Sequence, residues 1–116
     1  MLGTELKHSS FNEFIRANRF AVIHFWAAWN GSDAEMGELL QSQIPVELAA
    51  LIAVGSFDTD PAEHWDTCRE HNVRSLPFLA LYRNGKLVET LIGMRRSEEV
   101  IACFRRLVFE DGESAK

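Results

Sequence analysis

The chain has 116 residues, of which 47% are hydrophobic, enough for one globular domain with its own core. Its formal net charge of -5 predicts no nucleic-acid partner, because proteins that bind nucleic acids usually carry a basic face. No apolar stretch approaches the roughly 20 residues of a transmembrane helix, so we expect no membrane partner. Cys68 and Cys103 are not spaced as Cys-x-x-Cys, and the first residues lack a signal-peptide pattern. We therefore expect a cytoplasmic protein with reduced thiols.

The first half of the chain shows strand and helix patterns in alternation. We expect a domain over residues 1–109 and a polar, flexible tail over 110–116, with a short first strand near residues 5–6. Ser10 and Glu13 have capping-box spacing, which predicts the start of a helix. Residues 20–26 form an apolar run interrupted only by His24, as is typical of a central strand covered on both faces.

The next elements continue this alternation. From residue 32, apolar side chains recur at helical spacing until Pro45, where we expect the helix to end or kink. Residues 51–57 read as a second buried strand. Asp60 as a cap and Pro61 at the first helical position predict a third helix that runs to about residue 71.

The last third of the chain predicts a hairpin and a helix. Residues 78–82 and 87–92 flank Asn84 and Gly85, the pair that most readily forms a tight hairpin turn. Residues 97–108 then show one apolar helical face. Alternation followed by a hairpin predicts an α/β fold with a mixed central sheet between helices.

Several short motifs in the same order identify a family resemblance. Residues 25–29, Phe-Trp-Ala-Ala-Trp, resemble the segment before the thioredoxin active site, and residues 73–77, Val-Arg-Ser-Leu-Pro, resemble the segment that ends in the family's cis-proline. Residues 83–86 and Gly93 fall where the family has its Lys-Asn-Gly hairpin and a glycine that lines the substrate groove. The chain thus resembles thioredoxins over residues 5–108, which implies the thioredoxin fold, with helices on both faces of the mixed sheet.

The resemblance breaks where the chemistry would be. The former active-site motif is Asn30, Gly31, Ser32 and Asp33, in place of two cysteines. Thiol-disulfide exchange needs a thiolate nucleophile and a resolving thiol, and neither Asn30 nor Asp33 can attack a disulfide. The resemblance also places the family's buried aspartate and its lysine partner at His24 and near Val54. We therefore expect no catalytic residue in this motif. The chain would be an enzyme only if a thiol elsewhere in it acted instead.

Asn30 and Asp33 have two interpretations. Asparagine is a favoured N-cap residue, and a carboxylate in the first helical turn interacts well with the helix dipole. The alternative is that both side chains contact a partner. The capping interpretation is favoured because caps commonly use these residue types.

The rest of the family's groove is retained in the sequence. The resemblance implies that Trp29, Leu76, Pro77 and Gly93 line a peptide-binding groove around a cis-proline. We expect a redox-inactive binding or adaptor module, monomeric or weakly dimeric, with a protein or peptide partner and no cofactor. The alternatives are an atypical thiol-disulfide oxidoreductase that uses Cys68 or Cys103, and a structural or dimerising module.

Three other groups of residues are candidate sites. His24 is interpreted as a neutral core histidine rather than a pH switch, since no acid is predicted near it. His64, Cys68 and His71 share one helical stripe, but a fourth ligand is missing, so no metal is expected. The resemblance implies that acidic residues early in the 32–44 helix and basic residues after Gly93 lie on opposite rims of the groove: Asp33, Glu35, Glu38, Arg95 and Arg96. Surface solubility explains these charges equally well.

Overall fold

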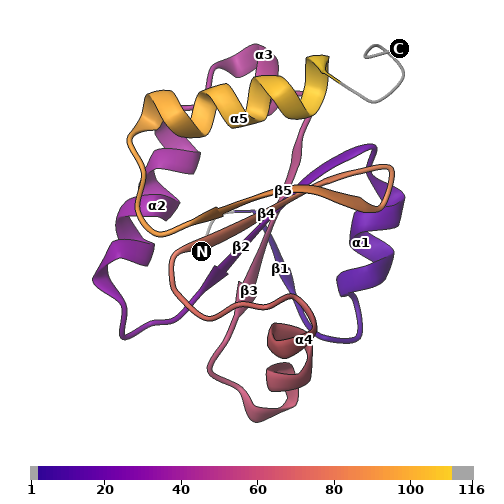
Figure 1. Ribbon diagram of the computed structural model, residues 1–116, viewed down its shortest axis with the longest axis vertical. Helices are drawn as coiled ribbons and strands as arrows, with labels where there is room; N and C mark the ends of the chain where they lie inside the picture. Colours follow the sequence, from indigo (N-terminus) through magenta and orange to yellow (C-terminus); the bar gives the residue numbers. More distant parts are fainter. Residues whose placement is uncertain (1–2, 111–116) are drawn as a thin grey trace.

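The computed structural model describes residues 3–110, so residues 111–116 of the expected tail lie outside the described part. Its helices and strands alternate before a final hairpin and helix (Figure 1). Their bounds are β1 Thr4–Leu6, α1 Phe11–Ala17, β2 Phe20–Trp26, α2 Gly31–Ser42, α3 Val46–Ala49, β3 Ala53–Asp58, the 3-10 turn η1 Ala62–His64, α4 Trp65–Glu70, β4 Phe78–Arg83, β5 Lys86–Ile92 and α5 Ser97–Phe109. Within residues 3–110, no helix is long and apolar enough to cross a membrane.

The five strands form one mixed sheet in the order β1-β3-β2-β4-β5. β3 runs parallel to both β1 and β2, whereas β4 is antiparallel to both β2 and β5. The expected α/β architecture is therefore confirmed. The central position of β2 explains its unbroken apolar sequence, because its side chains are buried on both faces of the sheet.

Each face of the sheet has its own hydrophobic core. One core joins β2 and β4 to α2, α3 and α5, with Met36, Leu48 and Phe104 fully buried in it. The other core lies under α1 and α4 and includes Phe11 and Phe57. In Figure 1, α2, α3 and α5 lie together on one side, and α1 and α4 lie apart from them. Helices thus cover both faces, as the sequence predicted.

Two local predictions were wrong in detail. The hydroxyl of Ser10 does not cap α1; it accepts a hydrogen bond from the Lys7 backbone N–H at 3.0 Å, because Ser10 itself has helical backbone angles. The third helix is split into η1 and the short α4, and its start is not capped by the Asp60 side chain. That carboxylate is bound instead to Trp29.

The two predicted tight bends are confirmed. Asn84 and Gly85 both have positive φ angles, 54° and 80°, at the turn between β4 and β5. The Leu76-Pro77 peptide bond is cis and stands immediately before β4. The cis bond precedes β4 and the hairpin turn follows it, and β4 lies between β2 and the edge strand β5.

Candidate functional site

The start of α2 is held to the cis-proline loop by Asn30. Its Oδ1 accepts a hydrogen bond from the Ser32 backbone N–H at 3.0 Å, which is the predicted N-cap. Its Nδ2 donates to the carbonyl oxygen of Leu76 at 3.2 Å. One amide side chain therefore caps the helix and fixes the loop 46 residues away, and only the first of these roles was expected from the sequence.

Asp33 lies inside the protein and binds His24. Its Oδ1 is 3.1 Å from His24 Nε2, and its Oδ2 accepts the Ala27 backbone N–H at 3.0 Å. Both side chains are only 1% exposed. The statement that no acid lies near His24 was wrong, because the bend between β2 and α2 brings residue 33 back over the strand. Asp33 is an interior anchor and has no surface to offer a partner.

His24 is neutral in this arrangement. Burial lowers its pKa, and this effect outweighs the neighbouring Asp33 carboxylate, which acts in the opposite direction. Its Nδ1 has no hydrogen-bond partner among the described residues. Protonation would place a second N–H on that unpartnered atom, which agrees with a lowered pKa. The interpretation as a core histidine with one hydrogen-bond partner is confirmed.

Two exposed tryptophans are fixed by one aspartate. Trp29 is 72% exposed and Trp65 is 53% exposed. The indole Nε1 of Trp29 donates to Asp60 Oδ1 at 2.9 Å, and that of Trp65 donates to the Asp60 carbonyl oxygen at 3.2 Å. Large apolar rings held this way lose little conformational entropy on binding, which favours a recognition role. The sequence analysis missed Trp65, although an indole in an otherwise polar helix was a usable signal.

These rings border a pocket of about 530 Å³, which we call the tryptophan pocket. Its walls come from the start of α2, the α4 helix and the loop before the cis-proline. Its lining includes Trp29, Trp65, Cys68, Val73, Arg74 and Leu76. Apolar surface and aromatic faces beside a few polar groups are typical of a binding site.

The structure places the four expected groove residues around this point. Trp29 and Leu76 line the tryptophan pocket. Pro77 is buried, and its carbonyl oxygen accepts the Gly93 backbone N–H at 2.8 Å. Gly93 has a φ angle of 85°, a conformation that favours glycine, and no atom lies within 4 Å of where a Cβ would be. The surface at Gly93 is therefore open beside the cis-proline.

Neither cysteine has the surroundings of a reactive thiol. Cys68 is half-buried in the tryptophan pocket, and burial raises its pKa. Cys103 is buried and donates from Sγ to Glu89 Oε2 at 3.2 Å. Burial and this carboxylate raise the pKa of Cys103 to about 11. Both thiols are protonated at neutral pH, and the two cysteines pack on opposite faces of the sheet.

The three residues of the proposed metal stripe are not arranged around a common point. His64 Nδ1 is 2.7 Å from the Asp58 carbonyl oxygen, and its ring stacks on Phe57 at a centroid distance of 4.3 Å. His71 Nδ1 is 2.8 Å from the Thr67 carbonyl oxygen. Over residues 3–110, no group of three or more His, Cys, Asp or Glu side chains could hold a metal ion.

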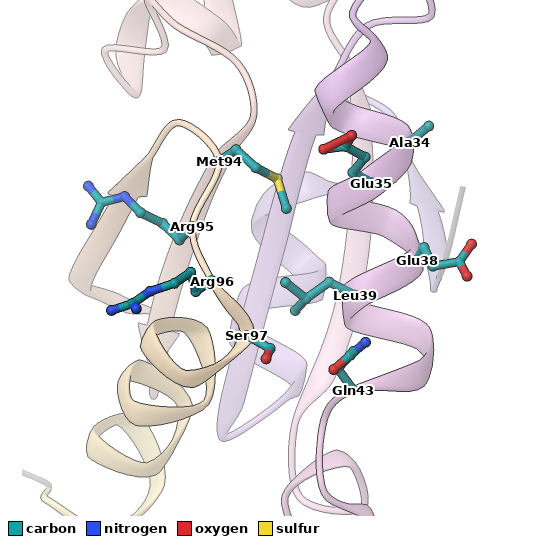
Figure 2. Close-up of a pocket in the computed structure, with 9 residues that line it drawn as sticks. All are labelled: Ala34, Glu35, Glu38, Leu39, Gln43, Met94, Arg95, Arg96 and Ser97. Carbon is teal, nitrogen blue, oxygen red and sulfur yellow. The ribbon is translucent and has the colours of Figure 1, made fainter.

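A second hollow lies on the other side of Gly93, between α2 and residues 94–97. Its volume is about 480 Å³, and we call it the α2 cleft. Figure 2 shows Met94 and Leu39 directed into it and the Glu35 carboxylate facing it, whereas Arg95 and Arg96 point away from α2. Glu35, Glu38, Arg95 and Arg96 therefore line this cleft, but the guanidinium groups do not face the acids. The expected acidic rim is wrong for Asp33, which is buried and bound to His24.

Comparisons with solved structures identify the class of protein to which this fold belongs. The structure superposes on a mutant thioredoxin from Halobacterium salinarum NRC-1 with a TM-score of 0.77, at 20% identity over 90% of this chain and 88% of that chain. It is also similar to mitochondrial thioredoxin 3 from Saccharomyces cerevisiae, with a TM-score of 0.76 and 24% identity over 88% and 92% of the two chains. These likenesses show the thioredoxin fold.

The sequence comparisons go one step further. The family model described as Thioredoxin matches residues 3–106. Thioredoxin from Alicyclobacillus acidocaldarius is 28% identical over 84% of this chain and 90% of its own length, and thioredoxin 2 from Chlorobaculum tepidum is 28% identical over 70% and 72%. The chain belongs to the thioredoxin family.

Proposed function

We propose that this thioredoxin-family protein is a redox-inactive module that binds a protein or peptide segment through the tryptophan pocket and the adjoining cis-proline groove. The observation that carries this proposal is the pair of exposed indoles that Asp60 fixes at the rim of that pocket. Such anchored aromatic rings beside Val73 and Leu76 offer a preformed apolar surface to a partner side chain.

The side chains at the start of α2 support the loss of redox chemistry. In the family, a thiolate at this helix start attacks the substrate disulfide and a second thiol resolves the mixed disulfide. In this chain Asn30 is bound to Leu76 and Ser32, and Asp33 is bound to His24. Every polar atom of these two side chains thus has a structural partner, and none of them is a nucleophile for sulfur.

A peptide-display experiment tests the binding proposal. A library of random nonapeptides without cysteine is selected on the immobilised protein, and enriched peptides are labelled with fluorescein for anisotropy titrations. We expect the enriched peptides to contain a large apolar residue. The Trp29→Ala, Trp65→Ala double variant should bind these peptides with an affinity at least about tenfold lower, because central aromatic residues each contribute about 1 kcal/mol or more to binding. Phe109→Ala is the matched control, because Phe109 is also an exposed aromatic residue but lies at the end of α5.

Two results would contradict the binding proposal. One is the absence of any enriched peptide. The other is equal binding to the native protein and to the double tryptophan variant, because the partner surface would then lie elsewhere.

The competing function is thiol-disulfide exchange through Cys68 or Cys103. We expect no reduction of insulin above the rate of dithiothreitol alone, because both thiols have raised pKa values. Turnover above that background, abolished by Cys68→Ser or by Cys103→Ser, would replace the binding proposal with an enzymatic one.

A further inference from the structure

The α2 cleft continues the binding surface past the cis-proline. Leu76 lines the tryptophan pocket, and Met94 lines the α2 cleft. Their chain neighbours Pro77 and Gly93 are joined by a backbone hydrogen bond of 2.8 Å. The two hollows therefore flank this bond, with the open surface of Gly93 between them. An extended peptide that crosses the bond reaches from one hollow to the other.

The floor of the cleft is apolar. Leu39 is buried in the α2 face of the core, and Met94 is 39% exposed. Figure 2 shows both side chains directed into the cleft from opposite walls. A thioether is a flexible and polarizable contact surface, so Met94 adapts to an aliphatic chain laid against it.

The charge that faces the cleft is negative. Glu35 is exposed on α2 and turns its carboxylate toward the cleft (Figure 2). It forms no ion pair within residues 3–110. Gln43 and Ser97 add a side-chain amide and a hydroxyl to the lining. A cation in this space therefore finds one unpaired carboxylate and further hydrogen-bond acceptors.

The nearby arginines are engaged elsewhere. Arg95 Nε donates to the Ile92 carbonyl oxygen at 3.2 Å, and its Nη1 is 3.8 Å from Glu99 Oε2. Arg96 Nε is 3.8 Å from the other oxygen of Glu99. Both guanidinium groups point away from α2 in Figure 2. Although the backbones and inner parts of both arginines line the cleft, their guanidinium groups are paired with Glu99 and not with Glu35.

From this arrangement we infer that the α2 cleft binds a lysine or arginine side chain of the same peptide segment whose apolar residue enters the tryptophan pocket. The aliphatic stem of the basic residue packs on Met94 and Leu39 while its charged end pairs with Glu35, which is the usual way that such side chains cover apolar surface. The net charge of -5 favours the approach of a basic segment. This inference rests on the proposed binding function and specifies the chemistry of the partner.

An oriented peptide library tests the inference. The probe is a pool of nonapeptides with a fixed central phenylalanine and all other positions randomised without cysteine, and the bound fraction is sequenced against the input. We expect lysine and arginine to be enriched at one side of the phenylalanine by about two- to fivefold, the range of one solvent-accessible ion pair. Glu35→Lys should remove this enrichment and favour aspartate and glutamate at the same position.

The control separates a local charge from the overall charge. Glu13→Lys makes the same change in net charge on α1, at an exposed position outside both hollows. It should leave the basic preference intact. The inference is overturned if native protein shows no basic preference, if Glu35→Lys leaves that preference unchanged, or if Glu13→Lys removes it equally.

The outcomes also separate this inference from the proposed function. If peptides bind and the double tryptophan variant loses them, but no basic residue is selected, the binding function stands and the cleft assignment falls. If the native protein selects no peptide, or if the double tryptophan variant retains full binding, the proposed function falls and the cleft assignment falls with it.

Discussion

Replacing Asp33 with alanine should destabilise the protein more than any substitution of a surface acid. The change removes the acceptor of two buried donors, His24 Nε2 and the Ala27 backbone N–H. Each buried donor left without a partner costs about 1–3 kcal/mol. We therefore expect the free energy of unfolding to fall by about 4 kcal/mol, a large part of the about 5–15 kcal/mol of an ordinary domain.

Urea unfolding followed by tryptophan fluorescence measures this loss. The matched control is Asp66→Ala, which removes an exposed ion pair with Arg69 and should cost less than about 1 kcal/mol. A second check places Asp33→Ala in a His24→Leu background, where the coupling between the two residues should make the loss smaller. If Asp33→Ala costs no more than Asp66→Ala, the buried pair does not hold β2 and α2 together, and the assignment of Asp33 as an interior anchor is wrong.

Three further predictions concern single groups. Burial lowers the pKa of His24, so the unfolded chain takes up a proton at a higher pH than the folded protein does. The free energy of unfolding is therefore highest above the usual histidine pKa of about 6.5 and falls as the pH drops below it. Urea unfolding at about pH 7.5 and pH 5 should show this decline, and a His24→Gln variant that still declines equally would contradict it. Cys103, with its pKa raised to about 11, should resist iodoacetamide in the folded protein while Cys68 reacts first, and rapid labelling of Cys103 counted by mass spectrometry would refute this. Asn30→Ala should cost about 1–2 kcal/mol through the lost cap and the lost bond to Leu76, and an unchanged urea midpoint would show that neither bond stabilises the fold.

The fold was predictable from local patterns because each pattern has a direct physical cause. The apolar run of β2 is typical of a strand covered on both faces, and Asn84-Gly85 supplies the positive φ angles of a hairpin. Helix starts were less predictable. The Ser10 hydroxyl and the Asp60 carboxylate each had a competing donor, Lys7 and Trp29, which sequence spacing does not reveal.

The site was predictable in its residues but not in its contacts. Residue spacing gave Asn30 as a cap, whereas its second bond joins it to Leu76, 46 positions away. The pair between His24 and Asp33 depends on how the chain bends after β2, and the fixing of Trp65 depends on a backbone carbonyl. Such contacts form only when distant segments pack together, so no local pattern encodes them.

The hydrogen bond between His24 and Asp33 also affects which substitutions position 33 can accept. A cysteine reintroduced at position 33 would leave the imidazole Nε2 and the Ala27 N–H without the carboxylate that now holds them inside the protein. The substitution would therefore lower stability unless position 24 changed as well. A thiol at this helix start is therefore expected to be tolerated best when residue 24 is replaced together with Asp33, so restoring the chemistry requires more than exchanging the residues of the former motif.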